Sequence, residues 1–408
     1  MITDRLIRPR VALLCACLVG VALLCGCAKS QSVTASGTAG SSAASDVVGG
    51  SRASSGSAAE ATAAPSDAAA VTTDSLQPPS YAGYEPLVSF TYHHVDPKLT
   101  YDIAITPATF EAQLKALKAA GFESVTVRDL LKHQTDGTPL PAKPVMLTFD
   151  DGWRNQFQYA APLLDKYGFK GVFFINPQTI GTYPGYMTRD MIVSLDQRGH
   201  DIENHTWQHI RLTRTRDVSE SAFQVRTKRQ LTLADKWIKA VTGKKPVALC
   251  YPFGYYDTEA IAFARANGYK FGFTVDEGVA DARPWDAMAM KRFTMDRSYS
   301  LATFMSLVNA APLQVRDIQP GPASRVPGLA TTIRMNVSEV PASVKDIKIF
   351  GGPSVKATTI TESGGQRFAE APLVKSAIGL KPITVKGRDS SGRKYFASWV
   401  LTMGDLKK

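Results

Sequence analysis

A short apolar run, Val145–Phe149, restricts the fold of this 408-residue chain more than any other segment. Four of its five residues are apolar, Pro144 precedes it, and Gly152 follows the adjacent carboxylates Asp150 and Asp151. A strand without polar alternation is covered on both faces, which is typical of the parallel sheets of α/β proteins. In such folds the carboxyl ends of the strands carry the chemistry. The run therefore predicts a buried parallel strand that presents two carboxylates at its end.

Strand-like and helix-like segments alternate between residues 85 and 312. Thr106 followed by Pro107 is typical of the start of a helix, and Gly121 of its end. The alternation predicts a parallel barrel built from β/α units. The expected strands are 87–95, 124–127, 145–149, 172–175, 247–251 and 269–274, and the expected helices are 106–121, 160–167, 218–241 and 258–266, with two more around Leu130 and Met191.

Two histidines, His205 and His209, have the spacing His-x-x-x-His. On one helical turn this spacing brings two imidazoles to the same face. With one carboxylate, Asp151, they make a three-ligand set of the kind that holds a hydrolytic metal ion. Zinc proteases with this spacing carry their base, a Glu, directly after the first His, but this chain has Thr206 there. We therefore expect the base to be Asp150, beside the ligand Asp151.

A third motif, Tyr251–Gly254, is a Pro-aromatic-Gly turn that ends a short apolar strand. Thr-Phe-Asp-Asp-Gly at 148–152, His-Thr-x-x-His at 205–209 and Tyr-Pro-Phe-Gly at 251–254, in this order, resemble the polysaccharide deacetylases, the NodB-homology group of carbohydrate esterase family 4. The resemblance covers residues 85–312. It implies a distorted, incomplete (β/α)7-type barrel with its site at the carboxyl-terminal rim of the strands.

The resemblance also implies a reaction, the hydrolysis of N-acetyl groups on a polymeric amino sugar. Asp151, His205 and His209 would hold the metal, and Asp150 would take a proton from the attacking water. The backbone N–H of Phe253 would stabilise the oxyanion. Zinc suits two imidazoles and one carboxylate, and nickel or cobalt would also fit. The side chains beside the motifs are the expected substrate contacts: Trp153, Tyr251, Pro252 and Tyr255.

Two departures from the family pattern concern the base and the acid. The family has an Arg two residues before the Pro of the third motif, where it steadies the base, but this chain has Cys250. Arg292 is the candidate that replaces it. The family acid is a His near the end of the domain, yet no His follows His209. The remaining histidines at a strand end are His93 and His94.

The opening motif Tyr-His-x-Val at 92–95, together with Tyr-Pro-Phe-Gly, resembles the branch that deacetylates exported poly-β-1,6-N-acetylglucosamine in biofilm formation. In that branch the first His of the opening motif lies in the active site, so the resemblance assigns the acid to His93. His94 is then either a supporting neighbour or a buried His bonded to backbone. His133 and His200 are expected to be structural.

Residues 1–27 resemble a bacterial lipoprotein signal. Basic residues precede the apolar run 11–24, which is short for a membrane span, and Cys27 is the expected site of lipidation. An uncleaved anchor is the alternative. Both predictions leave the rest of the chain outside the cytoplasm, anchored to the cell membrane. Residues 28–84, rich in Ser, Ala and Gly, are expected to form a disordered tether.

The pattern changes after residue 312. Prolines mark a connector at 313–326, and alternating apolar and polar residues in 327–408 predict half-buried antiparallel strands. This last segment resembles a small immunoglobulin-like β-sandwich. It would be a spacer, a packing partner for the barrel, or a glycan-binding domain.

The net charge of +11 is spread along the chain and forms no basic cluster interleaved with aromatics. This pattern argues against nucleic acid and suits acidic cell-surface polymers. The expected partners are an N-acetylated amino-sugar polysaccharide, the membrane through the lipid anchor, and polysaccharide export machinery. Two alternatives remain open: an N-deacetylase of peptidoglycan or chitin oligomers, and a non-catalytic glycan-binding surface lipoprotein.

Overall fold

The computed structural model describes residues 86–215, 217–281, 284–326, 330–374 and 379–404. The predicted lipoprotein signal, Cys27 included, and the predicted tether lie outside these residues. Within the described part of the chain, no helix combines the length and the apolar character needed to cross a membrane.

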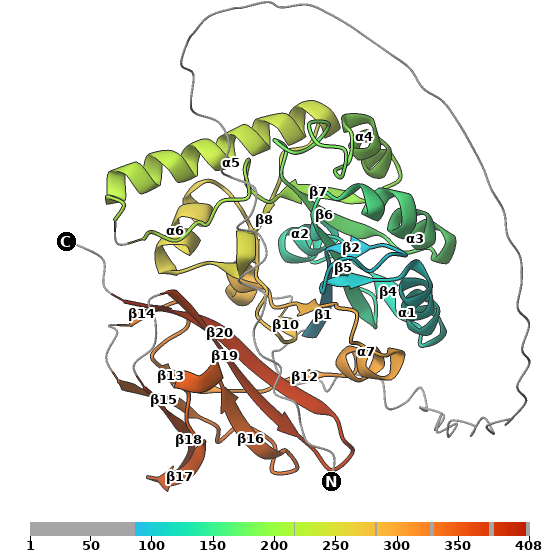
Figure 1. Ribbon diagram of the computed structural model, residues 1–408. Helices are drawn as coiled ribbons and strands as arrows, with labels where there is room; N and C mark the ends of the chain where they lie inside the picture. Colours follow the sequence, from blue (N-terminus) through green and yellow to red (C-terminus); the bar gives the residue numbers. More distant parts are fainter. Residues whose placement is uncertain (1–85, 216, 282–283, 327–329, 375–378, 405–408) are drawn as a thin grey trace, which may run out of the picture. The chain divides into compact units, whose positions relative to one another are not determined.

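The sheet of the barrel consists of parallel strands and one short antiparallel strand, β10 (Ala280–Asp281), at its β1 edge (Figure 1). Strand β1 (Pro86–Tyr92) pairs with β5 (Pro144–Asp151) on one edge and with β11 (Phe293–Thr294) on the other. The sheet continues from β5 through β6 (Gly171–Ile175), β7 (Asp201–Asn204), β8 (Ala248–Cys250) and β9 (Phe271–Phe273). Beyond β9, Phe273 forms an isolated parallel bridge with Met290. The strand order runs from one edge of the sheet to the other without closing into a ring, which confirms the predicted incomplete (β/α)7-type barrel.

Helices lie along the outside of this sheet (Figure 1). Helix α1 (Pro107–Ala119) begins as predicted, because the side chain of Thr106 accepts a hydrogen bond from the N–H of Thr109 at 3.0 Å and Pro107 occupies the first turn. The other helices are α2 (Val127–Asp136), α3 (Ala161–Tyr167), α4 (Arg189–Gln197), α5 (Glu220–Thr242), α6 (Thr258–Ala266) and α7 (Leu301–Val308).

Four predicted strands were too long. The segments 247–251 and 269–274 form only β8 and β9. The segment 124–127 contributes only the end of β4 (Glu123–Ser124), because Thr126 and Asp129 form a capping box that starts α2. The N–H of Thr126 donates to Oδ2 of Asp129 at 2.8 Å. The first strand stops at Tyr92, and His94 belongs to a separate pair, β2 (His94–Val95) with β3 (Ala104–Ile105). The bend between them leaves His93 outside the sheet.

The carboxyl-terminal part is all-β, as predicted. One sheet has the order β12-β20-β19-β16 with β14 beside β20, and the other has the order β13-β15-β18-β17. Both sheets contribute to one core, with Ile333 from β15 and Ile383 and Trp399 from β19 and β20. The strands are β12 (Ala311–Pro312), β13 (Arg316–Gln319), β14 (Arg325–Val326), β15 (Thr331–Asn336), β16 (Lys345–Phe350), β17 (Thr359–Ser363), β18 (Gln366–Leu373), β19 (Gly379–Arg388) and β20 (Lys394–Met403).

His200 is expected to make this fold sensitive to acid. Its side chain is fully buried, its Nδ1 accepts a hydrogen bond from the N–H of Gly171 at 3.0 Å, and its Nε2 lies 3.4 Å from Oδ1 of Asp165. Burial lowers the pKa of His200 from 6.5 to about 4. The unfolded chain therefore binds this proton at a higher pH than the folded chain does. Stability should fall as the pH drops from about 6.5 to about 4, by up to ~3 kcal/mol.

Urea unfolding at several pH values across this window measures the effect. In a His200→Asn variant, the Asn oxygen still accepts from Gly171 but binds no proton, so less stability should be lost on acidification. An equal loss in both proteins would assign the acid sensitivity to other groups.

Candidate active site

The predicted site residues come together where the parallel strands end. Asp150 and Asp151 end β5, His93 directly follows β1, and His205 directly follows β7. Phe253 lies in the turn after β8. Parallel strands end at the same edge of their sheet, so these residues share one rim even though they are far apart in sequence.

Asp151, His205 and His209 form a set that fits a metal ion. One ligand atom of each residue lies within 4.8 Å of the others, and Nε2 of each His is 3.4 Å from Oδ1 of Asp151. Nδ1 of His205 donates to the carbonyl oxygen of Cys250 at 2.8 Å, so Nε2 is the ring nitrogen directed at the set. Burial lowers the pKa of His209 to about 4, so its imidazole is neutral, as a ligand must be. Two imidazoles and one carboxylate suit zinc.

The predicted helical turn at His205 and His209 was wrong. Residues 205–209 form a loop in which Thr206 and His209 have positive φ values of 65° and 55°. The side chain of Asn204 accepts a hydrogen bond from the N–H of Thr206 at 2.6 Å, and the hydroxyl of Thr206 accepts from the N–H of Ile210 at 3.2 Å. These local bonds replace helical ones. The loop still brings the two rings within 4.7 Å of each other.

Asp150 is held by Arg292, which precedes β11. The two side chains are fully buried and form a bidentate pair, with Nη1 to Oδ1 and Nη2 to Oδ2 both at 2.8 Å. Arg292 also donates from Nε to the carbonyl oxygen of Thr274 and from Nη1 to the hydroxyl of Thr148, each at 2.8 Å. Burial alone would raise the pKa of Asp150, but the guanidinium of Arg292 holds it below its usual range. The carboxylate is therefore ionised at neutral pH.

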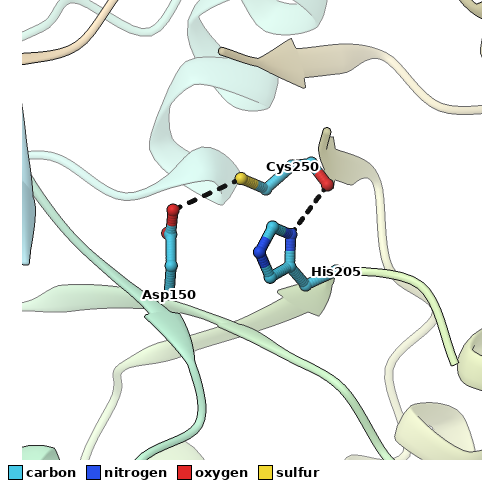
Figure 2. Close-up of side chains that lie close together, drawn as sticks. All are labelled: Asp150, His205 and Cys250. Atoms are coloured by element: carbon cyan, nitrogen blue, oxygen red, sulfur yellow. Dashed lines mark hydrogen bonds between the residues drawn. The ribbon is translucent and has the colours of Figure 1, made fainter. Parts of the chain in front are cut away.

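Cys250, at the position of the family Arg, contacts the same two side chains. Its Sγ accepts a hydrogen bond from Nη2 of Arg292 at 3.0 Å and donates to Oδ2 of Asp150 at 3.5 Å. Burial raises the pKa of this thiol, which keeps its proton. Figure 2 shows the thiol directed at Asp150 and the carbonyl oxygen facing His205. Because these groups already bond one another, we assign no second metal site to Asp150, His205 and Cys250.

Phe253 lies in a tight turn with a left-handed backbone, at φ 60° and ψ 10°. The N–H groups of Gly254 and Tyr255 donate to the carbonyl oxygens of Tyr251 and Pro252, but among the described residues the N–H of Phe253 has no backbone acceptor. The ring of Phe253 contacts His209, with ring centroids 4.3 Å apart. The turn thus holds one unused donor beside a candidate metal ligand.

His93 and His94 have different surroundings. His93 is close enough to the two carboxylates for its charge to lower the pKa of both Asp150 and Asp151, and its buried Nδ1 has no hydrogen-bond partner among the described residues. His94 is buried, and its Nδ1 contacts Nδ2 of Asn155 at 3.1 Å. Burial lowers the pKa of His94 to about 4, so it is neutral. Of the two, His93 has the ring nitrogen without a hydrogen-bond partner among the described residues, whereas His94 contacts Asn155.

Two predicted substrate contacts are corrected by the structure. Tyr251 is fully buried and its hydroxyl donates to the carbonyl oxygen of Met288 at 3.1 Å, so its side chain belongs to the core. Pro252 is buried in the same turn. The other two predicted contacts, Trp153 and Tyr255, are partly exposed. Nε1 of Trp153 donates to Oδ2 of Asp151 at 3.0 Å. Tyr255 is covered by Arg211, 4.1 Å from the ring centroid.

Two residues that were not predicted from the sequence support the base. Gln156, in the π-helical turn Gln156–Ala160, donates from Nε2 to the carbonyl oxygens of Asp150 at 2.6 Å and His93 at 2.8 Å. Thr148, the one polar residue inside the apolar run, donates its hydroxyl to the carbonyl oxygen of Phe90 at 2.9 Å beneath Asp150. A buried hydroxyl in an apolar strand is a signal that could have identified Thr148.

The chain resembles known proteins in the part that contains the candidate site. Residues 137–272 match the family described as polysaccharide deacetylase. The protein named "Putative polysaccharide deacetylase YxkH" of Bacillus subtilis is 28% identical over 201 residues, which is 49% of this chain and 69% of that protein. The poly-beta-1,6-N-acetyl-D-glucosamine N-deacetylase of Staphylococcus aureus strain MRSA252 is 23% identical over 198 residues, which is 47% of this chain and 68% of that protein.

A solved structure has the same fold. The Streptococcus pyogenes deacetylase PplD, in complex with acetate, aligns with a TM-score of 0.50 and 20% identity, covering 55% of this chain and 99% of that one. The aligned share is consistent with a match to the barrel. Residues 137–272 thus form a polysaccharide deacetylase domain, and members of this family are hydrolytic N-deacetylases.

Proposed function

We propose that this polysaccharide N-deacetylase is zinc-dependent, acts outside the cytoplasm on poly-β-1,6-N-acetylglucosamine, and is anchored to the membrane by a lipid at Cys27. One observation supports the proposal most directly: the rim holds both a ligand set and a base. Asp151, His205 and His209 are the ligands, and Asp150, paired with Arg292, is the buried base. A degenerate binding protein has no need for a second carboxylate held ionised beside the ligand set.

The chain's own groups divide the chemistry between them. A bound metal would polarise the amide carbonyl and make water more acidic. Asp150, kept ionised by Arg292, accepts the proton of the attacking water. The N–H of Phe253 donates to the carbonyl oxygen as it becomes an oxyanion. His93 gives a proton to the leaving nitrogen as the C–N bond breaks, so that acetate and a free amine result. Nickel or cobalt would fit the same ligands.

The substrate and the location rest on separate grounds. The relative from Staphylococcus aureus, 23% identical over 198 residues, is named for poly-beta-1,6-N-acetyl-D-glucosamine. The Tyr-His-x-Val opening at 92–95 supports the same polymer, with polysaccharide export machinery as the partner that delivers it. The lipoprotein-like signal supports the location. Recovery of lipid-modified protein in the membrane fraction, lost on Cys27→Ser, would test the anchor.

Acetate release is the test of the activity. The full-length protein, purified in detergent, would be incubated with poly-β-1,6-N-acetylglucosamine oligomers and, separately, with peptidoglycan. We expect the first polymer to release acetate. A chelator should stop this release and added zinc should restore it, since the ligand set is preformed. Acetate release from peptidoglycan alone would contradict the proposed substrate. Acetate release that continues after complete removal of metal would contradict the metal-dependent mechanism.

A further inference from the structure

A column of aromatic rings lies beside the candidate metal ligands. Tyr101 stacks on His94 with ring centroids 4.3 Å apart, and His94 packs on Trp153 at 4.5 Å. Beyond Trp153 the column continues to Tyr186, with ring centroids 4.2 Å apart. Tyr183 follows, with its ring centroid 6.2 Å from that of Tyr186. The ring centroids of Tyr101 and Trp153 are 6.4 Å apart, so the five rings form a column that bends at His94.

The column is anchored to the site at its centre. Nε1 of Trp153 donates to Oδ2 of Asp151 at 3.0 Å, which ties the middle ring to a candidate metal ligand. Trp153 also forms a β-bridge with Tyr186, and the N–H of Arg154 donates to the carbonyl oxygen of Gly185 at 2.9 Å. The rings are therefore held by backbone pairing as well as by stacking.

The two ends of the column are open to solvent. Tyr101 is 47% exposed and Tyr183 is 54% exposed, whereas His94 between them is 4% exposed. Tyr101 and Tyr183 thus continue a packed cluster of rings into solvent. A pyranose ring presents a face of C–H groups that packs on an aromatic face, and tyrosine adds a hydroxyl for hydrogen bonding.

We propose that Tyr101 and Tyr183 bind sugar residues of the polymer on either side of the residue being deacetylated. This inference rests on the proposed function, because the occupant is the amino-sugar chain whose acetyl group reaches Asp151 and its partners. Trp153 bonds Asp151 directly, and Tyr101 and Tyr183 are linked to Trp153 through His94 and Tyr186, so both tyrosines lie outside the reacting groups. The enzyme would then prefer polymers long enough to contact both tyrosines over short oligomers.

The test compares oligomers of increasing length on the zinc-loaded, full-length protein. Removing both rings in Tyr101→Ala/Tyr183→Ala should raise KM for long oligomers by about tenfold, leave kcat unchanged and leave short oligomers unaffected. Tyr101→Phe and Tyr183→Phe should retain the parental KM, because the stacking faces remain. Tyr159→Ala is the matched control: this residue is 37% exposed and makes no aromatic contact among the described residues.

Several outcomes would overturn this inference. One is a double Ala variant that keeps the parental dependence on chain length. Another is a fall in kcat on short and long oligomers alike, which would mean that the rings merely support Trp153 and Asp151. A parent protein that releases no acetate from the polymer would instead count against the proposed function. In that case, calorimetry of oligomer binding to the parent and the double variant decides the inference, and equal affinities overturn it.

Discussion

Replacing Asp150 by Asn is expected to lower kcat/KM for acetate release by about 10³-fold, because a positioned general base contributes roughly 10² to 10⁴ in rate. Asparagine has nearly the same shape, so the barrel rim should keep its geometry. It can still accept a hydrogen bond from Arg292 but takes no proton from water. The measurement is steady-state acetate release by zinc-loaded protein.

Metal content separates this effect from loss of the ligands. Asp150 is not in the ligand set, so Asp150→Asn should bind as much metal as the parent, whereas Asp151→Asn should bind less. Asp196→Asn is the matched control, because Asp196 is also paired with a cation, Lys244 at 2.7 Å, but on helix α4. Parental activity in a metal-loaded Asp150→Asn variant would exclude Asp150 as the base.

Replacing Arg292 by Leu is expected to lower the free energy of unfolding by about 3–5 kcal/mol, because removing one partner of a buried ion pair leaves the other charge uncompensated. The carboxylate of Asp150 is 1% exposed, and its neighbours Thr91 and Cys250 approach only to 3.5 Å. They cannot replace two charged donors at 2.8 Å. Urea unfolding at neutral pH measures the loss.

A second variant distinguishes the charge from the packing of the Arg292 side chain. In Asp150→Asn/Arg292→Leu no buried carboxylate remains, so this double variant should be more stable than Arg292→Leu alone. Arg292→Lys keeps the charge but not the planar fork that reaches Asp150, Thr148 and Thr274 together, and should fall between parent and Leu variant. Losses that simply add in the double variant would show that the pair is not coupled.

The Arg292 pair also accounts for the departure from the family pattern at Cys250. The guanidinium reaches the base from the segment before β11, and a side chain as large as Arg at position 250 would compete with it for the same space. The smaller thiol instead bonds both partners. Asp150 therefore has a guanidinium partner although position 250 is Cys. Its environment includes the rings of Phe174 and Phe273, 5.6 and 5.9 Å from the guanidinium carbon.

The alternation of strands and helices in the barrel was predictable because it follows from local pattern. An apolar run without alternation, 145–149, can only be buried on both faces, and the residues that end it must lie at the rim. The first turn of α1 was predictable for the same kind of reason, since Thr106 and Pro107 act on their own neighbours. The loop at His205 was not, because the side chain of Asn204 competes with helical hydrogen bonding, and spacing alone does not reveal that competition.

By itself the sequence determined the strand and helix order of the barrel, the end of β5 at Asp150 and Asp151, and the residue types able to hold a metal. Only the tertiary structure decided that Arg292 pairs with Asp150 across 142 positions, that Tyr251 is buried, and that Tyr101 joins a column of rings beside the site. The physical reason is the range of the interactions. Period and capping act within a few residues, whereas contacts between distant segments depend on which strands are neighbours in the sheet and on how side chains pack between them.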